Sequence, residues 1–272
     1  MGHQPRKRFG QNFLQKQDVI DDILHVIGPQ SDDLMVEIGP GLGALTTPLA
    51  KALRQLHVIE LDRDIVKVLR GKYANDNVVI HEGDALKFDF ASLGAGLRVV
   101  GNLPYNISTP LLFHLAAYID SVRDIHAMLQ KEVVERMVAA PGTSAYGRLS
   151  VALQYRFDME KVLDVGHDSF YPQPKVDSAV IRMLPCATRE PAAQDEALFA
   201  RIVTTAFSQR RKTLRNTLRN VLEVADYEAL GIDPGVRAET LAVSDFVRIA
   251  NWVKEHPKKS LATDYTDKPE RI

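Results

Sequence analysis

The sequence contains a single cysteine, Cys186, among its 272 residues, which excludes an internal disulfide. Its eight histidines are scattered without metal-ligand spacing, so we expect no metal site. Long apolar runs are also missing, because no stretch approaches the roughly 20 apolar residues of a membrane-spanning helix. Residues 1–8 are polar and basic and lack the apolar segment of a secretory signal. We therefore expect a cytoplasmic protein that is neither exported nor embedded in a membrane.

The rest of the composition is that of an ordinary globular protein. Hydrophobic residues make up 45% of the chain and charged residues 25%, which excludes disordered and fibrous classes for most of its length. A chain of this length lies at the size where one domain becomes two. We expect one large and one small domain.

Positive charge is concentrated in two segments, although the formal net charge is only -1. Residues 1–17 and residues 201–222 contain no acidic side chain. Such segments neutralise phosphates locally, although each one alone is equally consistent with a solvated helix face. Their basic residues are Arg6, Lys7, Arg8, Lys16, Arg201, Arg210, Arg211, Lys212, Arg215 and Arg219.

Short apolar runs alternate with helical patterns through the first half of the chain. The predicted strands are 34–38, 55–61, 78–81, 97–100 and 125–129, and the predicted helices are 44–53, 65–73, 110–118 and 131–138. This alternation requires crossover connections and predicts a doubly wound α/β domain with a parallel sheet. Two more strands, 161–165 and 178–184, flank a proline-rich loop and predict an antiparallel end to the sheet.

The pattern changes after Pro185. Residues 186–193, with Pro185 and Pro191 and several small residues, indicate a linker. Beyond it, periodicity predicts helices at 196–208, 209–224, 225–230, 235–240 and 244–255. The predicted domains are therefore 1–190, including the basic segment 1–17, and a small all-helical domain over 191–256. Residues 257–272 are predicted to form a disordered tail.

A glycine-rich turn, Gly39-Pro40-Gly41-Leu42-Gly43-Ala44, follows the first strand and opens a helix. Glycines there let the backbone approach a ligand closely, and the next strand ends at Glu60, where an acid suits ribose hydroxyls. The turn alone also satisfies the loose dinucleotide fingerprint of nicotinamide enzymes. However, Glu37 suits an ammonium better than a pyrophosphate, and Asp84 suits an adenine amino group. Together these residues favour S-adenosylmethionine over NAD.

The loop Asn102-Leu103-Pro104-Tyr105 follows the strand predicted at 97–100. The exocyclic amine of a nucleobase is a poor nucleophile because its lone pair is delocalised, so an alkylating enzyme must hold both amine hydrogens and the ring plane. The Asn102 side-chain carbonyl and the Leu103 backbone carbonyl suit the hydrogens, and the Tyr105 ring suits stacking. Taken alone, the loop is more simply an ordinary Asn-x-Pro turn.

Several longer motifs accompany this loop, and they extend over about Arg6 to Val253. They are RKRFGQNFL (6–14), EIGPGLG (37–43), GNLPYNISTPLL (101–112), LQKEVV (129–134), YGRLS (146–150) and FYPQPKVDS (170–178). With them the chain resembles the small-subunit (16S) rRNA adenine N6,N6-dimethyltransferases of the KsgA/RsmA family. The resemblance implies a Rossmann-like, S-adenosylmethionine-dependent methyltransferase domain followed by a helical domain. It also implies dimethylation of two adjacent adenosines in the 3'-terminal hairpin of 16S rRNA, within the 30S particle, during small-subunit biogenesis.

The resemblance also implies roles for individual residues. Cofactor contacts are expected from Asn12, Leu14, Gly39, Glu60, Asp84 and Asn102, to which the loop reasoning adds Glu37 and Gly41. The target amine is expected between Asn102 and Tyr105, with Phe170 as a second aromatic face, although Phe170 is equally consistent with a core residue. RNA backbone contacts are expected from Arg6, Lys7, Arg8, Arg210, Arg211, Lys212 and Arg215. Ser144 departs from the family pattern, since many relatives have a lysine there, and this puts one phosphate contact in doubt.

The predicted mechanism is direct displacement, in which a flipped adenine amine attacks the sulfonium methyl group and S-adenosylhomocysteine leaves. No catalytic base or metal is required, no obligate protein partner is expected, and we expect a monomer. Three alternatives remain from the sequence: a large-subunit rRNA dimethyltransferase of the erythromycin-resistance type, a 30S assembly factor whose methylation is incidental or lost, and a nicotinamide oxidoreductase. The last lacks a suitably placed Tyr-Lys or His-Asp pair.

Overall fold

The computed structural model describes residues 12–74, 76–186 and 190–257, and the chain divides into two compact units. The first unit comprises the residues up to 135 together with 157–187, and the second comprises 136–156 together with the residues from 188 onward. The basic residues Arg6, Lys7 and Arg8 and the tail beyond Pro257 lie outside the described residues.

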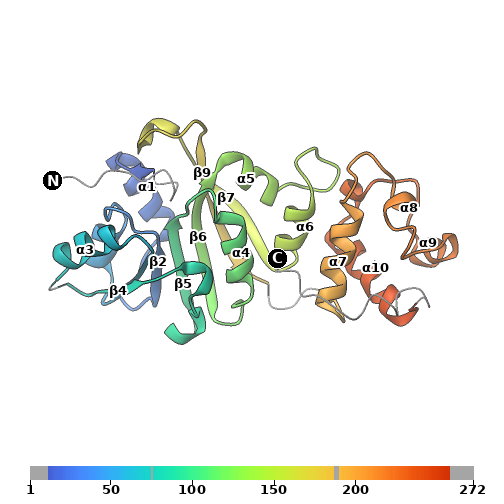
Figure 1. Cartoon of the computed structure of the whole chain (residues 1–272), viewed down its shortest axis with the longest axis horizontal. Coiled ribbons are helices and arrows are strands. Elements are labelled where there is room, and N and C mark those ends of the chain that lie inside the picture. Colours follow the sequence, from blue (N-terminus) through green and yellow to red (C-terminus); the bar gives the residue numbers. More distant parts are fainter. Residues whose placement is uncertain (1–11, 75, 187–189, 258–272) are drawn as a thin grey trace. The chain divides into compact units, whose positions relative to one another are not determined.

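A seven-stranded sheet forms the centre of the first unit (Figure 1). Its strands are β2 (Met35–Ile38), β3 (Leu56–Glu60), β4 (Val78–Glu82), β5 (Leu97–Asn102), β6 (Val122–Gln130), β7 (Phe157–Val165) and β9 (Ser178–Pro185). Their order across the sheet is β4-β3-β2-β5-β6-β9-β7, with β2 to β6 parallel and β9 antiparallel to both of its neighbours. The predicted doubly wound fold with an antiparallel end is confirmed.

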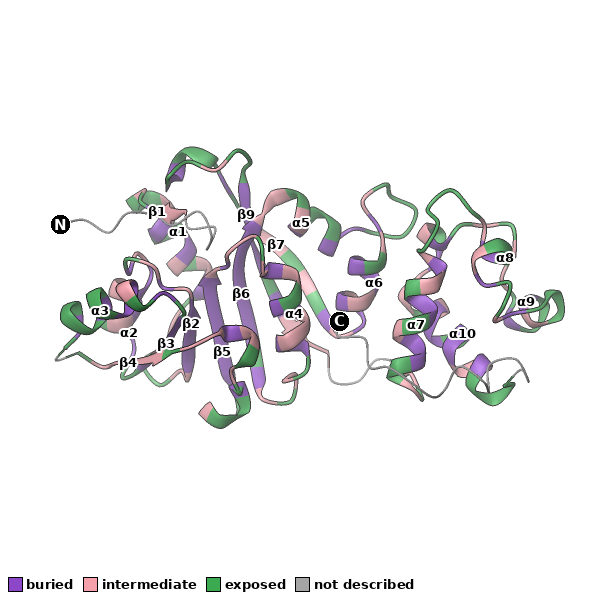
Figure 2. Cartoon of the chain, in the orientation of Figure 1, coloured by how far each residue is buried: buried purple, intermediate pink, exposed green. Residues whose placement is uncertain are grey.

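Helices cover the sheet because its central strands, β2 and β5 among them, are buried on both faces. The helices of this unit are α1 (Gln17–Ile27), α2 (Thr46–Ala52), α3 (Arg63–Lys72), α4 (Ser108–Ala116) and α5 (Lys131–Met137), the last of which crosses the boundary at residue 135. Ile23 of α1 and Leu49 of α2 belong to the same apolar cluster as Met35 and Val58. Val36, which alternates with Met35 along β2, is equally buried on the opposite face. Figure 2 shows β2, β5 and β6 buried over most of their lengths.

A second, two-stranded sheet joins distant parts of the first unit. Its strands are β1 (Phe13–Leu14) and β8 (Phe170–Tyr171), which pair antiparallel with Leu14 opposite Phe170. Both of these side chains are buried, and a further backbone bond joins Gln15 N–H to the Ser169 carbonyl at 2.8 Å. The pairing carries the segment around Asn12 to the carboxyl ends of the parallel strands.

The second unit is helical. Its helices are α6 (Arg148–Gln154), α7 (Glu196–Ala206), α8 (Leu214–Thr217), α9 (Val224–Leu230) and α10 (Val243–Glu255), with a 3-10 turn at Ala238–Thr240. The predicted helix over 209–224 is wrong in extent, since α-helix in this range is limited to the four residues of α8 and to Val224, where α9 begins. Leu218 and Leu222 are buried at helical spacing, but residues 209–212 contain no apolar side chain to bury, and they close a turn from the Lys212 N–H to the Gln209 carbonyl.

The division into units differs from the predicted boundaries in one segment. Residues 136–156 were assigned to the α/β domain, but α6 belongs to the helical unit because its apolar residues pack there. Val151 and Tyr155 join the cluster of Phe199 and Phe246, and the rings of Tyr155 and Phe199 lie 4.5 Å apart. The later boundary, expected after residue 190, falls after residue 187.

Candidate active site

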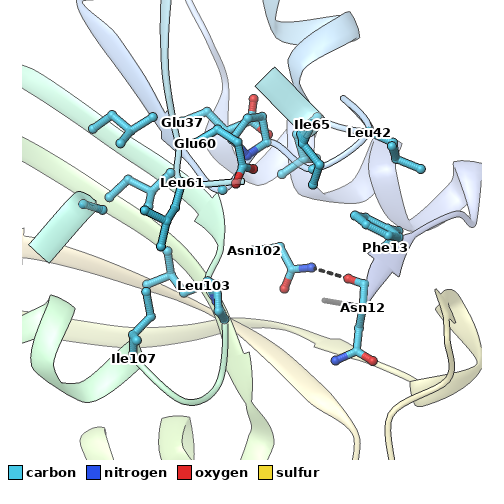
Figure 3. A pocket seen from close by; sticks show the side chains of 18 of the residues that line it. Asn12, Phe13, Glu37, Leu42, Glu60, Leu61, Ile65, Asn102, Leu103 and Ile107 are labelled. Carbon is cyan, nitrogen blue, oxygen red and sulfur yellow. Dashed lines mark hydrogen bonds between the residues drawn. The ribbon is translucent and has the colours of Figure 1, made fainter. Parts of the chain in front are cut away.

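A pocket lies at the carboxyl ends of the parallel strands in the first unit, where the strand order reverses between β2 and β5 (Figure 3). Open α/β sheets bind ligands at this topological switch point. Four groups of residues form its wall: Asn12 with strand β1, the glycine loop with the end of β2, the end of β3 with the segments that follow β3 and β4, and the loop after β5. They include Asn12, Phe13, Leu14, Glu37, Gly39, Gly41, Leu42, Glu60, Leu61, Ile65, Gly83, Asp84, Asn102, Leu103, Pro104, Tyr105 and Ile107.

Side chains are excluded at two places around the pocket, one in the glycine loop and one at the end of β5. Gly41 has a φ of +55°, and a Cβ there would lie 3.0 Å from the Phe13 ring. Gly101, at the end of β5, would place a Cβ 2.4 Å from the carbonyl oxygen of Ile38. The ends of β2 and β5 can therefore lie together only with glycine at residue 101.

Two buried acids stand behind the glycine loop. Glu37 is 2% exposed and accepts a hydrogen bond from the Thr46 hydroxyl at 2.6 Å, while burial raises its pKa to about 7. Glu60 is 8% exposed, and burial raises its pKa although backbone N–H groups of Asp62, Leu61 and Gly41 bond to it. Glu60 therefore holds the glycine loop as well as facing the pocket, a function that sequence reasoning missed.

Asp84 also both faces the pocket and stabilises the neighbouring backbone. It lines the pocket just after β4, and its Oδ1 accepts the Leu86 N–H at 3.0 Å, which caps a 3-10 turn. The predicted adenine partner is thus fixed in place by the turn that follows it.

The Asn102 side chain is oriented by the chain segment before β1. Its Nδ2 donates to the Asn12 backbone carbonyl at 3.0 Å, shown dashed in Figure 3. This bond fixes the orientation of the amide, whose Oδ1 is the atom that can accept a hydrogen bond from a ligand. The following residues do form a turn, with Leu103 N–H bonded to Met128 and Ile107 N–H bonded to Pro104. The turn interpretation therefore describes the geometry of this loop, while its position on the pocket wall gives the loop access to a ligand.

Tyr105 is held by a residue far away in the sequence. Its hydroxyl lies 2.7 Å from the Oγ of Ser178, a fully buried residue at the start of β9. Burial raises the pKa of the half-buried Tyr105 hydroxyl, which remains protonated at neutral pH. The hydrogen bond anchors the hydroxyl end of the ring at the pocket wall. Ser178 was visible in the sequence only as the end of a motif, and no local signal linked it to Tyr105.

Phe170 lies elsewhere than the predicted base pocket. Its side chain is 5% exposed and belongs to the apolar cluster that contains Leu14 and Ile20, and it is not among the pocket-lining residues. As the side chain stands in this structure, the interpretation as a core phenylalanine describes it. The aromatic residue that sequence reasoning missed is Phe13, which lines the pocket against Gly41.

The basic residues predicted at residues 210–215 are exposed on the second unit. Arg210 donates to the Ser144 carbonyl at 2.6 Å, and its Nε lies 3.9 Å from Glu239. The segment that lacks acids in sequence therefore has an acid nearby in space. Within the described part of the chain, Arg211, Lys212 and Arg215 have no recorded carboxylate partner.

The described residues contain no helix that is long and apolar enough to cross a membrane. In the same part of the chain, no three His, Cys, Asp or Glu side chains gather as a metal site requires.

Comparison with known proteins agrees with this geometry. The sequence model of the family described as Ribosomal RNA adenine dimethylase matches residues 2–255. A curated protein of Chromobacterium violaceum, named Ribosomal RNA small subunit methyltransferase A, is 61% identical over 93% of this chain and 97% of its own length. The protein of the same name from Nitrosospira multiformis is 60% identical over 93% of this chain and 97% of its own length.

Solved structures share the fold. A dimethyladenosine transferase from Plasmodium falciparum superposes with a TM-score of 0.76 at 26% identity, covering 87% of this chain and 95% of its own. The 23S rRNA methyltransferase ErmE has a TM-score of 0.70 at 24% identity, covering 89% and 100%, and shows similarity of fold alone. With a family match over nearly its whole length and curated relatives at about 60% identity, the chain belongs to the ribosomal RNA adenine dimethylase family.

Proposed function

We propose that the protein dimethylates the N6 amine of two adjacent adenosines in the 3'-terminal hairpin of 16S rRNA, within the 30S subunit, with S-adenosylmethionine as methyl donor. The observation that carries the proposal is the Asn102 side chain. Its Nδ2 donates to the Asn12 carbonyl, which fixes the orientation of the amide, and its Oδ1 is the acceptor at the pocket wall. The Leu103 backbone lies beside it on the same wall and offers a second carbonyl.

The residues around the glycine loop fit S-adenosylmethionine. Gly39 has a φ of +67°, a backbone conformation that favours glycine, and a Cβ there would lie in contact with the Asn102 carbonyl oxygen at 3.7 Å. Glu37, Glu60 and Asp84 supply acceptors for an ammonium, ribose hydroxyls and an adenine amino group, whereas three acids would repel a pyrophosphate. When bound, this cofactor supplies an electrophilic methyl group on a sulfonium.

The chain's own contribution is alignment. The Asn102 and Leu103 carbonyls accept the two hydrogens of the adenine amine and stabilise the positive charge that develops on its nitrogen. Tyr105 fixes the plane of the base by stacking, and its bond to Ser178 keeps the ring in place. The amine releases its proton readily once a methyl group has made it cationic, so no side chain has to act as a base. For Phe170 to form the second aromatic face of the base pocket, its ring would have to leave the apolar core.

The exposed cations of the second unit support RNA binding. Arg210, Arg211, Lys212 and Arg215 lie within one short stretch around α8, and a duplex or hairpin carries closely spaced phosphates. Arg6, Lys7 and Arg8 would add to this contact from the N-terminal segment. We further propose that the protein acts as a monomer in the cytoplasm and needs no metal.

The test is methyl incorporation from labelled S-adenosylmethionine into unmethylated 30S and 50S particles, with primer extension to locate the modified bases. The expected result is incorporation into 30S particles alone, with stops at two adjacent adenosines. Incorporation into 50S particles would instead support the erythromycin-resistance type. Binding to 30S particles without methyl incorporation would support the alternative of an assembly factor. Binding of NAD in place of S-adenosylmethionine would refute the proposed cofactor.

A further inference from the structure

An exposed aromatic residue lies next to the pocket and takes no part in the function proposed so far. Tyr171 is 60% exposed, although it belongs to β8 and follows the buried Phe170. In the antiparallel pair it stands opposite Phe13. Opposite residues of such a pair project to the same face of the sheet, and Phe13 lines the pocket. The Tyr171 side chain is therefore at the rim of the pocket, on the face that Phe13 presents.

The loop that begins at Tyr171 returns to the pocket at its other end. It closes at Asp177, whose carboxylate accepts from the His167 N–H at 3.0 Å and whose carbonyl accepts from Lys131 N–H. The next residue, Ser178, bonds to Tyr105 on the pocket wall. Both ends of loop 171–177 are thus fastened to elements that carry pocket residues, at Phe13 through the pairing of β1 with β8 and at Tyr105 through Ser178.

The side chains of this loop offer an apolar surface with one positive charge. Val176 is exposed as well as Tyr171. Lys175 is exposed and, within the described part of the chain, has no recorded carboxylate partner, because Asp177 is engaged by His167. Tyr171 and Lys175 are thus an exposed aromatic ring and an exposed cation in the same short loop. Proteins combine such groups to hold a nucleobase together with its phosphate.

The base flipping that the proposed reaction requires exposes one face of the neighbouring nucleobase. When one of two adjacent adenosines is flipped into the pocket, its neighbour loses a stacking partner. We propose that Tyr171 stacks on the nucleobase next to the flipped adenosine, with Lys175 at the adjoining phosphate. This inference rests on the proposed function, and it assigns a substrate contact outside the pocket itself.

The experiment combines a protein variant with a change in the RNA. Tyr171→Ala removes the ring and Tyr171→Phe keeps it, while Val68→Ala, at an exposed apolar residue of α3, serves as the matched control. For each protein we would measure kcat and KM with unmethylated 30S subunits. We would also measure the affinity for a synthetic 3'-terminal hairpin, intact or abasic at the nucleotide next to the target adenosine.

The expected result is a KM for 30S subunits about tenfold higher for Tyr171→Ala, within the range that stacking of one base provides. Tyr171→Phe and Val68→Ala should match the wild type. The abasic hairpin should bind the wild type about tenfold more weakly than the intact hairpin, but Tyr171→Ala should bind both equally. Lys175→Gln should weaken binding at low salt and have little effect at high salt, whereas the effect of Tyr171→Ala should persist.

Two results would overturn the inference: a wild-type KM for Tyr171→Ala, or an abasic penalty of equal size in both proteins. Either result with an active wild type leaves the proposed function standing. A wild type that methylates no 30S subunits would refute the proposed function, and the hairpin affinities would still test the stacking contact.

Discussion

Substitution of Gly101 by alanine tests whether close approach of β2 and β5 builds the pocket. An alanine Cβ would lie 2.4 Å from the Ile38 carbonyl oxygen and 3.3 Å from the Ile38 carbonyl carbon and nitrogen. Ordinary contacts begin at about 3.4 Å, so the two backbones must separate by about 1 Å. Neither strand can yield without disturbing its other neighbour, because β2 also pairs with β3 and β5 with β6.

The cost follows from overpacking and from weakened ladder bonds. A forced backbone shift in a packed core costs roughly 1 to 3 kcal/mol, and each strained buried hydrogen bond adds about 1 kcal/mol. We expect Gly101→Ala to lower the free energy of unfolding by about 2 to 4 kcal/mol. The same shift displaces Gly39 from Asn102, so cofactor affinity should fall as well.

The matched control is Gly71→Ala, at an exposed residue of α3 where an added Cβ meets nothing within 4 Å. Removal of a helical glycine should stabilise the protein by about 0.5 to 1 kcal/mol. Hydrogen exchange would be followed in β2 and β5, and Trp252, the single tryptophan, would report on the second unit separately. Unchanged protection of β2 and β5 in Gly101→Ala would refute the reasoning.

Three further predictions concern single groups. Burial raises the pKa of Glu37 to about 7 from 4.5, so its native state binds a proton more strongly than the unfolded chain. Deprotonation of Glu37 should therefore lower the free energy of unfolding of the cofactor-free protein by about 3 kcal/mol as the pH rises from 4.5 to 7. Urea unfolding at pH 5 and at pH 8 would measure this loss, which should be absent in Glu37→Gln. Ser178→Ala and Tyr105→Phe remove the same hydrogen bond, so each should lower kcat/KM by roughly tenfold, and the double variant should be no worse than either; additive losses would contradict a shared role. Affinity for 30S subunits should fall steeply with salt, and the slope should be shallower for Arg211→Gln than for the wild type; equal slopes would remove Arg211 from the phosphate contact.

The central parallel strands β2, β3 and β5 were predictable because they are buried on both faces and apolar residues therefore dominate them. The strand predicted at 97–100 is a case in point, since β5 covers it and continues only to Asn102. The glycine turn and the acids after the strands were predictable for the same reason, because they follow directly from where the strands end. The sequence alone therefore indicated most of the pocket.

The missing parts depend on contacts between residues far apart in the chain. The Asn102 bond to Asn12 spans 90 positions and the Tyr105 bond to Ser178 spans 73, and neither has a local pattern. Two-residue strands such as β1 and β8 carry no period, so Phe13 and Phe170 could not be placed. The segment 136–156 was assigned to the wrong unit because its partners, the helices α7 and α10, follow much later in the sequence.

The central claim is that Asn102 presents its carbonyl to the adenine amine, and methyl transfer to unmethylated 30S subunits by Asn102→Ala tests it most directly. Thermal unfolding would be measured in parallel to establish that the variant is folded. The account predicts a loss of methyl incorporation of at least roughly a hundredfold, as for removal of one group that stabilises transition-state charge. Normal turnover by a folded Asn102→Ala variant would contradict it.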